Sequence, residues 1–292
     1  MTEAITFHNA EKQMSAAAVG GLVKDIPIPS RPVVIQKMQD EMAKGEPDIR
    51  RIAQIIGQDI GITLAVLKMV NSPIYGLSRR AESIDQAVGL IGMKQLGILV
   101  TALAMRSFLK CDQALLDHFY VTSARRAQAM SYIAKSSGVG DVAMAQTFGL
   151  FCDVGIPMLL HRFPGYRDTL QQAQEDHERA FTAVEQQAHH TDHSLIGALM
   201  VKSWGLNPHV ALAIRLHHDY AVFLEPKVPT EVVRLIAMNL IAEAAIQRYA
   251  QNHLDAEWSK GGENVGSALS MNPAEVEECI EQLLDLFANG LE

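Results

Sequence analysis

Apolar residues recur along nearly the whole chain at the 3.6-residue spacing of an amphipathic helix, and this pattern constrains the fold more than any other feature. The segment "DIRRIAQIIG", for example, places Ile49, Ile52, Ala53 and Ile56 on one stripe. We find neither the two-residue alternation of half-buried strands nor a hairpin turn signal between apolar runs. The sequence therefore predicts an all-α protein.

Prolines and glycines divide this pattern into separate helices, in "PIPSRP", "KGEPD", "NSPIYG", "SSGVGD", "RFPGY" and "EPKVP". Helix starts are expected at two capping boxes, Ser83-x-x-Gln86 and Thr182-x-x-Glu185, and at Asn207-Pro208. The stretch "DAEWSKGGENVGSALSMN" has the composition of a linker. An amphipathic helix is expected after it, over residues 273–289, and we expect that helix to pack on its own chain in preference to a second copy.

The charge balance limits the classes of partner. The 292-residue chain has a formal net charge of -8, which argues against general attraction to nucleic acid or anionic membrane. Three arginine pairs are interpreted as solvated helix faces without a functional role: Arg50-Arg51, Arg79-Arg80 and Arg125-Arg126.

The cysteines and the apolar runs bear on the compartment. Cys111, Cys152 and Cys279 are widely spaced and odd in number, so they indicate neither a disulfide framework nor a zinc-thiolate site. The longest uncharged stretches fall short of the roughly 18 residues that a membrane span needs. We expect a cytoplasmic protein without membrane association.

Two parts of the sequence resemble one known family. Residues 28–96, with the Pro-rich entry, "NSPIYG" and "SIDQAVGLIGMKQL", resemble the N-terminal half of the HDOD domain, the HD-related output domain. Residues 112–252, with "TFGLFCDVGIPML" and "DHSLIGALMVKSWGLNPHVALAIRLHHD", are similar to its HD-like half. The resemblance implies an HDOD domain over 15–252, in which a helical half (15–111) packs on a degenerate HD-type half (112–252). Residues 253–292 would be a linker and a C-terminal helix.

The resemblance also allows a residue-by-residue test of catalysis, because HD phosphohydrolases hold a divalent metal with His and Asp side chains. The first ligand His corresponds to Thr122, and the His of the His-Asp pair corresponds to Cys152, which we expect to be buried. The Lys or Arg of the motif corresponds to Ile156, and the last Asp to Met238 or Asn239. These losses predict no catalytic residues, no cofactor and no metal.

Four residual metal candidates remain at positions that the family retains: Asp153, His193, His217 and His218. Adjacent residues on a helix point about 100° apart, so His217 and His218 are not expected to serve one ion without a special bend. Structural use of these histidines is the preferred interpretation.

The resemblance favours a non-enzymatic regulatory module of bacterial signal transduction that binds a signalling protein. Its binding surface is expected between the two halves, at Asn71, Ser72, Tyr75 and Asp153, although a purely structural helix-turn-helix would explain the first three. The alternative is a divergent metal-dependent phosphohydrolase acting on a nucleotide or cyclic dinucleotide, which would need a divalent transition metal. Nucleotide binding without hydrolysis and a homodimer also stay open.

Overall fold

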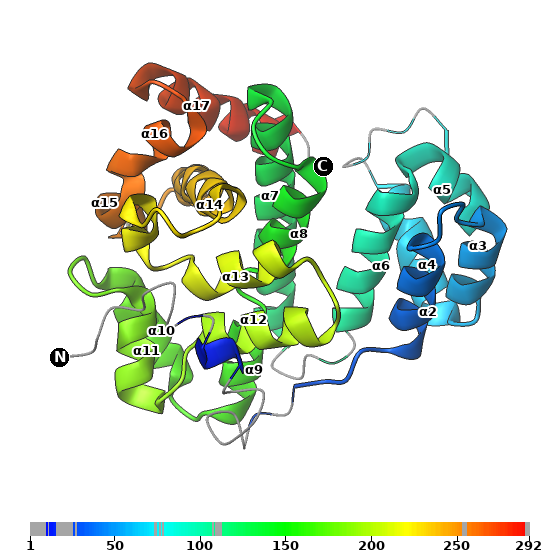
Figure 1. The fold of residues 1–292 in the computed structure, drawn as a ribbon, viewed down its shortest axis with the longest axis horizontal. Coiled ribbons are helices and arrows are strands. Elements are labelled where there is room, and N and C mark those ends of the chain that lie inside the picture. The colour runs from blue at the N-terminus through cyan, green and yellow to red at the C-terminus, as the bar shows by residue number, and fades with distance from the viewer. Residues whose placement is uncertain are drawn as a thin grey trace. The chain divides into compact units, whose positions relative to one another are not determined.

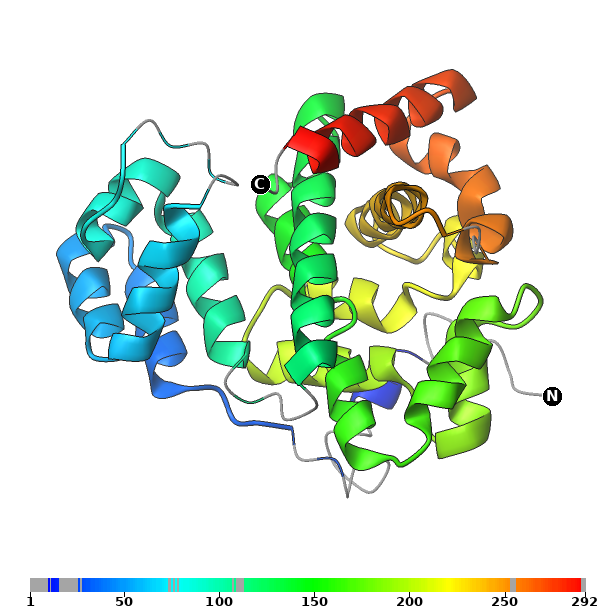
Figure 2. The same cartoon turned by 180° about the vertical axis from the view of Figure 1, so that it is seen from behind.

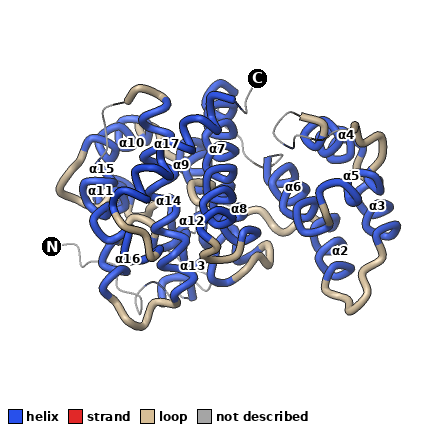
Figure 3. Tube along the Cα trace, turned by 90° about the horizontal axis from the view of Figure 1, so that it is seen from above, coloured by secondary structure: helices blue, strands red, loops and turns tan. Residues whose placement is uncertain are grey.

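The computed structural model describes residues 10, 12–15, 26, 28–72, 75, 77, 79–106, 108, 113–252 and 256–289. Within these ranges every regular element is a helix and none is a strand, so the predicted all-α class is confirmed (Figure 3). The chain divides into two compact units. Unit 1 comprises Met1–Ile28 and Lys110–Phe287, and unit 2 comprises Pro29–Leu109 and Ala288–Glu292.

Unit 2 is a small bundle of five labelled helices. They are α2 (Val33–Met42), α3 (Ile49–Gly57), α4 (Ile60–Val70), α5 (Ile84–Ile91) and α6 (Met93–Arg106). On α3, Ile52 and Ile56 of the predicted stripe are buried in the core together with Ile55, whereas Ile49 of that stripe is 42% exposed. Asp48 and Asp59 cap α3 and α4 by accepting hydrogen bonds from backbone amides of the first turns.

Unit 1 contains the longer helices (Figures 1 and 2). Their bounds are α7 (Gln113–Ser137), α8 (Val142–Phe151), α9 (Gly155–Arg162), α10 (Tyr166–Glu175), α11 (Phe181–His189), α12 (His193–Ser203), α13 (Pro208–Leu216), η2 (Tyr220–Leu224), α14 (Thr230–Tyr249), α15 (Ala256–Gly261), η3 (Gly262–Asn264), α16 (Val265–Leu269) and α17 (Pro273–Asn289). Helix α14 packs against α7, α13 and α16, and most of its residues are buried.

The helix-start signals give mixed results. Ser83 caps α5, Asn207 caps α13 ahead of Pro208, and Asn272 and Glu275 form a reciprocal capping box at the start of α17. The capping box predicted at Thr182 is wrong, because α11 begins at Phe181 and its N-cap residue, Ala180, has no capping side chain. The Glu185 side chain has a different role, described below.

Described residues before Pro29 belong to unit 1. Gln13 accepts a hydrogen bond from Arg215, and Ile26 packs beside Leu159 and Tyr166, whereas the sequence grouped residues 15–111 together. The stretch interpreted as a linker forms α15, η3 and α16. Helix α17 packs on its own chain, as expected, with Tyr132 donating to Gln282 (Figure 2).

One helical stretch of the described chain could cross a membrane by length and composition, Val142–Arg162, and up to three could if each of two bent helix pairs is counted as a span. Buried residues make up 56% of its apolar window. This stretch includes Asp153, which is paired with Arg126. The absence of membrane association stays a prediction.

Candidate metal centre

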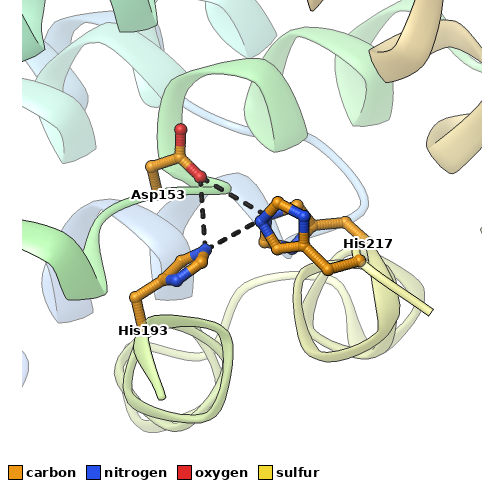
Figure 4. A group of neighbouring side chains, drawn as sticks. Asp153, His193 and His217 are labelled. Atoms are coloured by element: carbon orange, nitrogen blue, oxygen red, sulfur yellow. Dashed lines mark hydrogen bonds and ion pairs between the residues drawn. The ribbon is translucent and has the colours of Figure 1, made fainter. Parts of the chain in front are cut away.

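Four side chains that are distant in sequence converge in unit 1: Asp153, His193, His217 and His218. Asp153 lies in the turn between α8 and α9, His193 is the first residue of α12, and the other two histidines follow α13. Each offers one ligand atom, and these four atoms all lie within 4.8 Å of one another. Figure 4 shows three of the side chains pointing toward a common point. We call this group the histidine cluster.

A close contact between α9 and α12 brings Asp153 beside His193. A Cβ atom on Gly155 would overlap the carbonyl oxygen of His193 and lie 2.8 Å from its carbonyl carbon. Only glycine permits this approach, because no side-chain atom separates the two backbones. Asp192 caps α12 by accepting a hydrogen bond from the Leu195 amide at 2.8 Å, which fixes the position of His193 in the first turn.

Neighbouring histidines at the end of α13 both reach the cluster. We expected adjacent residues to diverge as they do within a helix, but α13 ends at Leu216 and His217 is its C-cap residue. The two imidazole rings lie with their centroids 4.0 Å apart. Both histidines reach the cluster although the backbone of His217 stays in the right-handed helical region, so the expected divergence is wrong.

The separations between three of the four donor atoms, those of Asp153, His193 and His217, match those around a tetrahedral metal. The Nε2 atoms of His193 and His217 lie 3.3 Å apart, and Oδ1 of Asp153 lies 3.6 Å from the first and 3.4 Å from the second (Figure 4). Four donors placed tetrahedrally at about 2.1 Å from a metal are about 3.4 Å from one another. Imidazole nitrogen and carboxylate oxygen are ligands that Zn, Fe or Ni accept.

Each histidine of the cluster has an acceptor at its other ring nitrogen. Nδ1 of His193 lies 2.7 Å from Oε2 of Glu185, Nδ1 of His217 lies 2.7 Å from the carbonyl oxygen of Ile214, and Nδ1 of His218 lies 2.6 Å from Oε2 of Glu257. Carboxylates and carbonyls accept only, so each Nδ1 carries the hydrogen. In the neutral rings Nε2 therefore has its lone pair free, which is how metal-binding histidines are oriented by their surroundings.

The second oxygen of Asp153 is bound by an arginine. Oδ2 lies 2.8 Å from Nη2 of Arg126, and Nε of Arg126 donates to Glu243 at 2.6 Å. Arg126 is buried on α7, so its interpretation as part of a solvated face is wrong. Its neighbour Arg125 instead lies over the Tyr249 ring, 4.8 Å from the centroid. Asp153 thus faces the histidines with one oxygen and a guanidinium with the other.

The pKa values in the cluster follow from burial and these partners. Burial by itself would raise the pKa of Asp153, but the Arg126 guanidinium holds it well below the usual range. Burial would lower the pKa of His193, but the Glu185 carboxylate outweighs this effect and raises it to about 9. Burial and the neighbouring His217 lower the pKa of His218 to about 4. The environments of His193 and His218 thus shift the pKa in opposite directions.

The positions of the missing family ligands do not join the cluster. Cys152 is buried as predicted, and burial raises the pKa of its thiol well above its usual value. Met238 and Asn239 are buried on α14, and Thr122 is half-buried on α7, one turn before Arg126. Helix α14 instead supplies Glu243, one turn after Asn239, whose carboxylate pairs with Arg126 beside the cluster.

Sequence reasoning missed four residues around the cluster: Arg126, Glu185, Glu243 and Glu257. One signal was available, since Arg126 lies four residues after the position of a lost ligand and so on the same face of α7. Glu257 had no signal, because it lies in the apparent linker and 39 residues from His218.

The predicted binding residues of unit 2 have local structural bonds. Asn71 ends α4, and its side chain both accepts from the Ala81 amide at 2.7 Å and donates to the Ala81 carbonyl at 2.8 Å. Ser72 donates to the Met69 carbonyl at 2.6 Å, and Tyr75 is half-buried. Pro73 and Gly76 of "NSPIYG", like Cys111, lie outside the described residues. Asp153 belongs to unit 1, so a surface shared with these residues stays a prediction.

Comparisons with known proteins agree on the fold. An uncharacterized protein of Treponema pallidum (strain Nichols) is 25% identical over 236 residues, which are 80% of this chain but 44% of that protein, so the chain spans less than half the length of this relative. A crystal structure from Shewanella amazonensis SB2B, whose protein is provisionally called a phosphohydrolase, matches with a TM-score of 0.69 and 20% sequence identity. The match covers 92% of this chain and 95% of the Shewanella chain. A crystal structure from Marinobacter aquaeolei VT8, whose protein is provisionally called a signal transduction protein, matches with a TM-score of 0.72 and 16% sequence identity. This match covers 98% of this chain and 65% of the Marinobacter chain.

The most direct comparison is with the domain family itself. Residues 28–220 match the HDOD domain, which is about two thirds of the chain and includes all four residues of the histidine cluster. Glu243 and Glu257 lie beyond the matched residues. The resemblance seen in the sequence is thereby confirmed, and this chain belongs to the HDOD domain family.

Proposed function

We propose that this chain is a regulatory module of a signal-transduction pathway that acts by binding, and that its HD-like unit holds one divalent transition metal at the histidine cluster. The observation that carries the proposal is the spacing of 3.3 to 3.6 Å between the Nε2 atoms of His193 and His217 and Oδ1 of Asp153. A bound metal would tie together the α8–α9 turn, α12 and the end of α13, and would act as a Lewis acid only toward a group that could reach it.

The charges around the cluster fit a divalent cation. Four carboxylates contact the cluster or its partners, and two cations contact these carboxylates: Asp153, Glu185, Glu243 and Glu257 against Arg126 and Lys260. This leaves an excess of two negative charges when all three imidazoles are neutral, as metal ligands must be, and the raised pKa of His193 means that a proton on this ring offsets one of them in the metal-free site. Buried charge is costly unless it is paired, so a divalent ion would relieve this excess.

Two features favour binding over turnover. A hydrolytic metal needs an open position for water and room for the substrate. Here the side chains of His193 and His217 are 0% and 2% exposed, and Phe181 stacks on His218 with ring centroids 4.6 Å apart. The second oxygen of Asp153 is bound to Arg126. Approach of a phosphate ester to the cluster would therefore require side chains to move.

Metal analysis tests this proposal directly. We expect about one Zn, Fe, Mn or Ni ion per chain in the purified protein by mass spectrometric elemental analysis, and no hydrolysis of bis(p-nitrophenyl) phosphate or cyclic dinucleotides. His217→Ala should lose the metal because one of the four donors is removed. His209→Ala, on the helix that His217 caps but outside the cluster, is the matched control and should keep it. A wild-type protein that takes up no metal would contradict the proposed site.

The phosphohydrolase alternative is favoured by one observation, the orientation of all three Nε2 atoms by acceptors at Nδ1. Hydrolytic metal centres orient their ligands in the same way. Metal-dependent turnover that disappears in His217→Ala and persists in His209→Ala would establish this function and overturn binding alone.

The binding partner is proposed from family resemblance only. A signalling protein is the expected partner, and Asn71, Ser72 and Tyr75 are the residues of unit 2 proposed to contact it. A nucleotide ligand, a homodimer and a cytoplasmic location likewise stay predictions.

A further inference from the structure

The C-terminal segment of the chain reaches the histidine cluster through one side chain. Oε2 of Glu257, on α15, accepts from Nδ1 of His218 at 2.6 Å and from the Tyr220 hydroxyl at 2.5 Å. Its other oxygen, Oε1, lies 2.9 Å from Nζ of Lys260. The His218 and Glu257 side chains are 11% and 20% exposed. These shielded contacts make Glu257 the group that orients His218.

The packing of α15 holds Glu257 in this place. A Cβ atom on Gly261 would lie 2.6 Å from the Tyr220 ring and 2.9 Å from the Leu240 side chain, so glycine lets the end of α15 rest directly on both. Ala256, Val265 and Leu269 of the same segment are buried. Helices α15 and α16 pack on α14, and α17 continues the segment along the unit. The position of Glu257 therefore depends on docking of the whole segment.

We propose that residues 256–287 are a metal-coupled segment, in which docking of the segment and metal binding at the histidine cluster stabilise each other through Glu257 and His218. The proposal rests on the metal site proposed above and names its regulation. It concerns a part of the chain beyond the residues that match the HDOD domain. Glu257 is a positioning residue: it sets which ring nitrogen of His218 faces the metal without touching the metal itself.

The coupling has the same size in both directions. Loss of a side chain that orients a metal-binding histidine lowers metal affinity by about 10- to 100-fold. Coupling between two sites is reciprocal, so metal binding must favour the docked segment by the same factor. The fraction of molecules in which α15 to α17 are docked would thus depend on whether a metal occupies the cluster. A regulatory module could use this difference to signal whether metal is bound.

The experiment uses the full chain, freed of metal and titrated with Zn²⁺ against a chromophoric chelator. Glu257→Ala should bind Zn²⁺ about 10- to 100-fold more weakly than the wild type. Glu263→Ala is the matched control, because Glu263 is an exposed carboxylate on the same segment, and its affinity should be unchanged. Glu257→Gln should recover part of the affinity, since its amide oxygen can still accept from His218 Nδ1.

Two further measurements separate orientation from a general loss of stability. In the wild type, saturating Zn²⁺ should slow hydrogen exchange of α15 and α16 amides by about 10- to 100-fold, and this change should disappear in Glu257→Ala. The visible spectrum of the Co²⁺-loaded protein should shift in Glu257→Ala and stay the same in Glu263→Ala.

The outcomes distinguish this inference from the proposed function. A wild-type protein that binds neither Zn²⁺ nor Co²⁺ and carries no Fe, Mn or Ni as purified would defeat the metal site and the inference together. The coupling would be wrong if the wild type and Glu257→Ala bound Zn²⁺ equally well and if Zn²⁺ did not change the hydrogen-exchange rates of the α15 and α16 amides. The proposed metal site would be unaffected by that result.

Discussion

Arg126→Met is expected to lower the free energy of unfolding of unit 1 by about 3 kcal/mol. Removing one partner of a buried ion pair leaves an uncompensated charge, which costs about 3–5 kcal/mol. Here two carboxylates, Asp153 and Glu243, lose their common cation. We expect the lower end of that range because these carboxylates are 18% and 21% exposed and retain some contact with water.

Urea denaturation of the metal-free protein, followed by tryptophan fluorescence, measures this effect. Both tryptophans of the sequence, Trp204 and Trp258, belong to unit 1, so the signal reports that unit alone. The matched control is Arg125→Met. Arg125 stacks on Tyr249, a contact worth about 0.5–1 kcal/mol at exposed sites, so we expect a loss of that size. Equal losses at the two adjacent arginines would show that Arg126 does not neutralise the carboxylates.

Gly155→Ala is expected to destabilise unit 1 by about 3 kcal/mol and to weaken Zn²⁺ binding about tenfold or more. The added methyl group would overlap the His193 carbonyl group, and both partners in this contact are backbone, which cannot move aside as a flexible side chain can. Overpacking of this kind typically costs about 1–3 kcal/mol. Separation of α9 from α12 would also move Asp153 away from His193 and spoil the metal geometry.

Gly89→Ala is the comparison for this change. Gly89 lies inside α5 of unit 2, where a Cβ atom would meet nothing within 4 Å. Alanine in a helix interior is favoured over glycine by about 0.5–1 kcal/mol, so this variant should be slightly more stable and should bind Zn²⁺ as the wild type does. If Gly155→Ala bound Zn²⁺ equally well, the α9–α12 contact would not be what positions the cluster.

The helices and many of their boundaries could be read from local sequence. Ser83 and Asn207 begin helices as predicted, because a capping side chain bonds backbone amides only two or three residues away. The capping box at Thr182 failed for an equally physical reason. The Glu185 side chain that would have completed it accepts hydrogen bonds from His193 and Tyr166 instead, and so helps to orient a cluster histidine.

The identities of the four cluster residues also came from sequence, through the positions that they share with a family. Their convergence did not. His217 and His218 were expected to diverge as on an ideal helix, yet at the end of α13 their ring centroids lie 4.0 Å apart. Asp153 approaches His193 only because Gly155 lets two helix backbones touch.

The sequence by itself determined the helical class and several helix starts, since each depends on residues within one or two turns of one another. It named the four cluster residues as residual candidates only through the family resemblance, and it predicted no metal there. Only the tertiary structure decided which of two adjacent arginines is buried, which carboxylate orients His218, and that an apparent linker is a packed part of unit 1. The paired residues are far apart in the sequence: Arg126 is 27 positions from Asp153 and 117 positions from Glu243. No local pattern encodes such pairs, because the energy that forms them arises only when the helices pack.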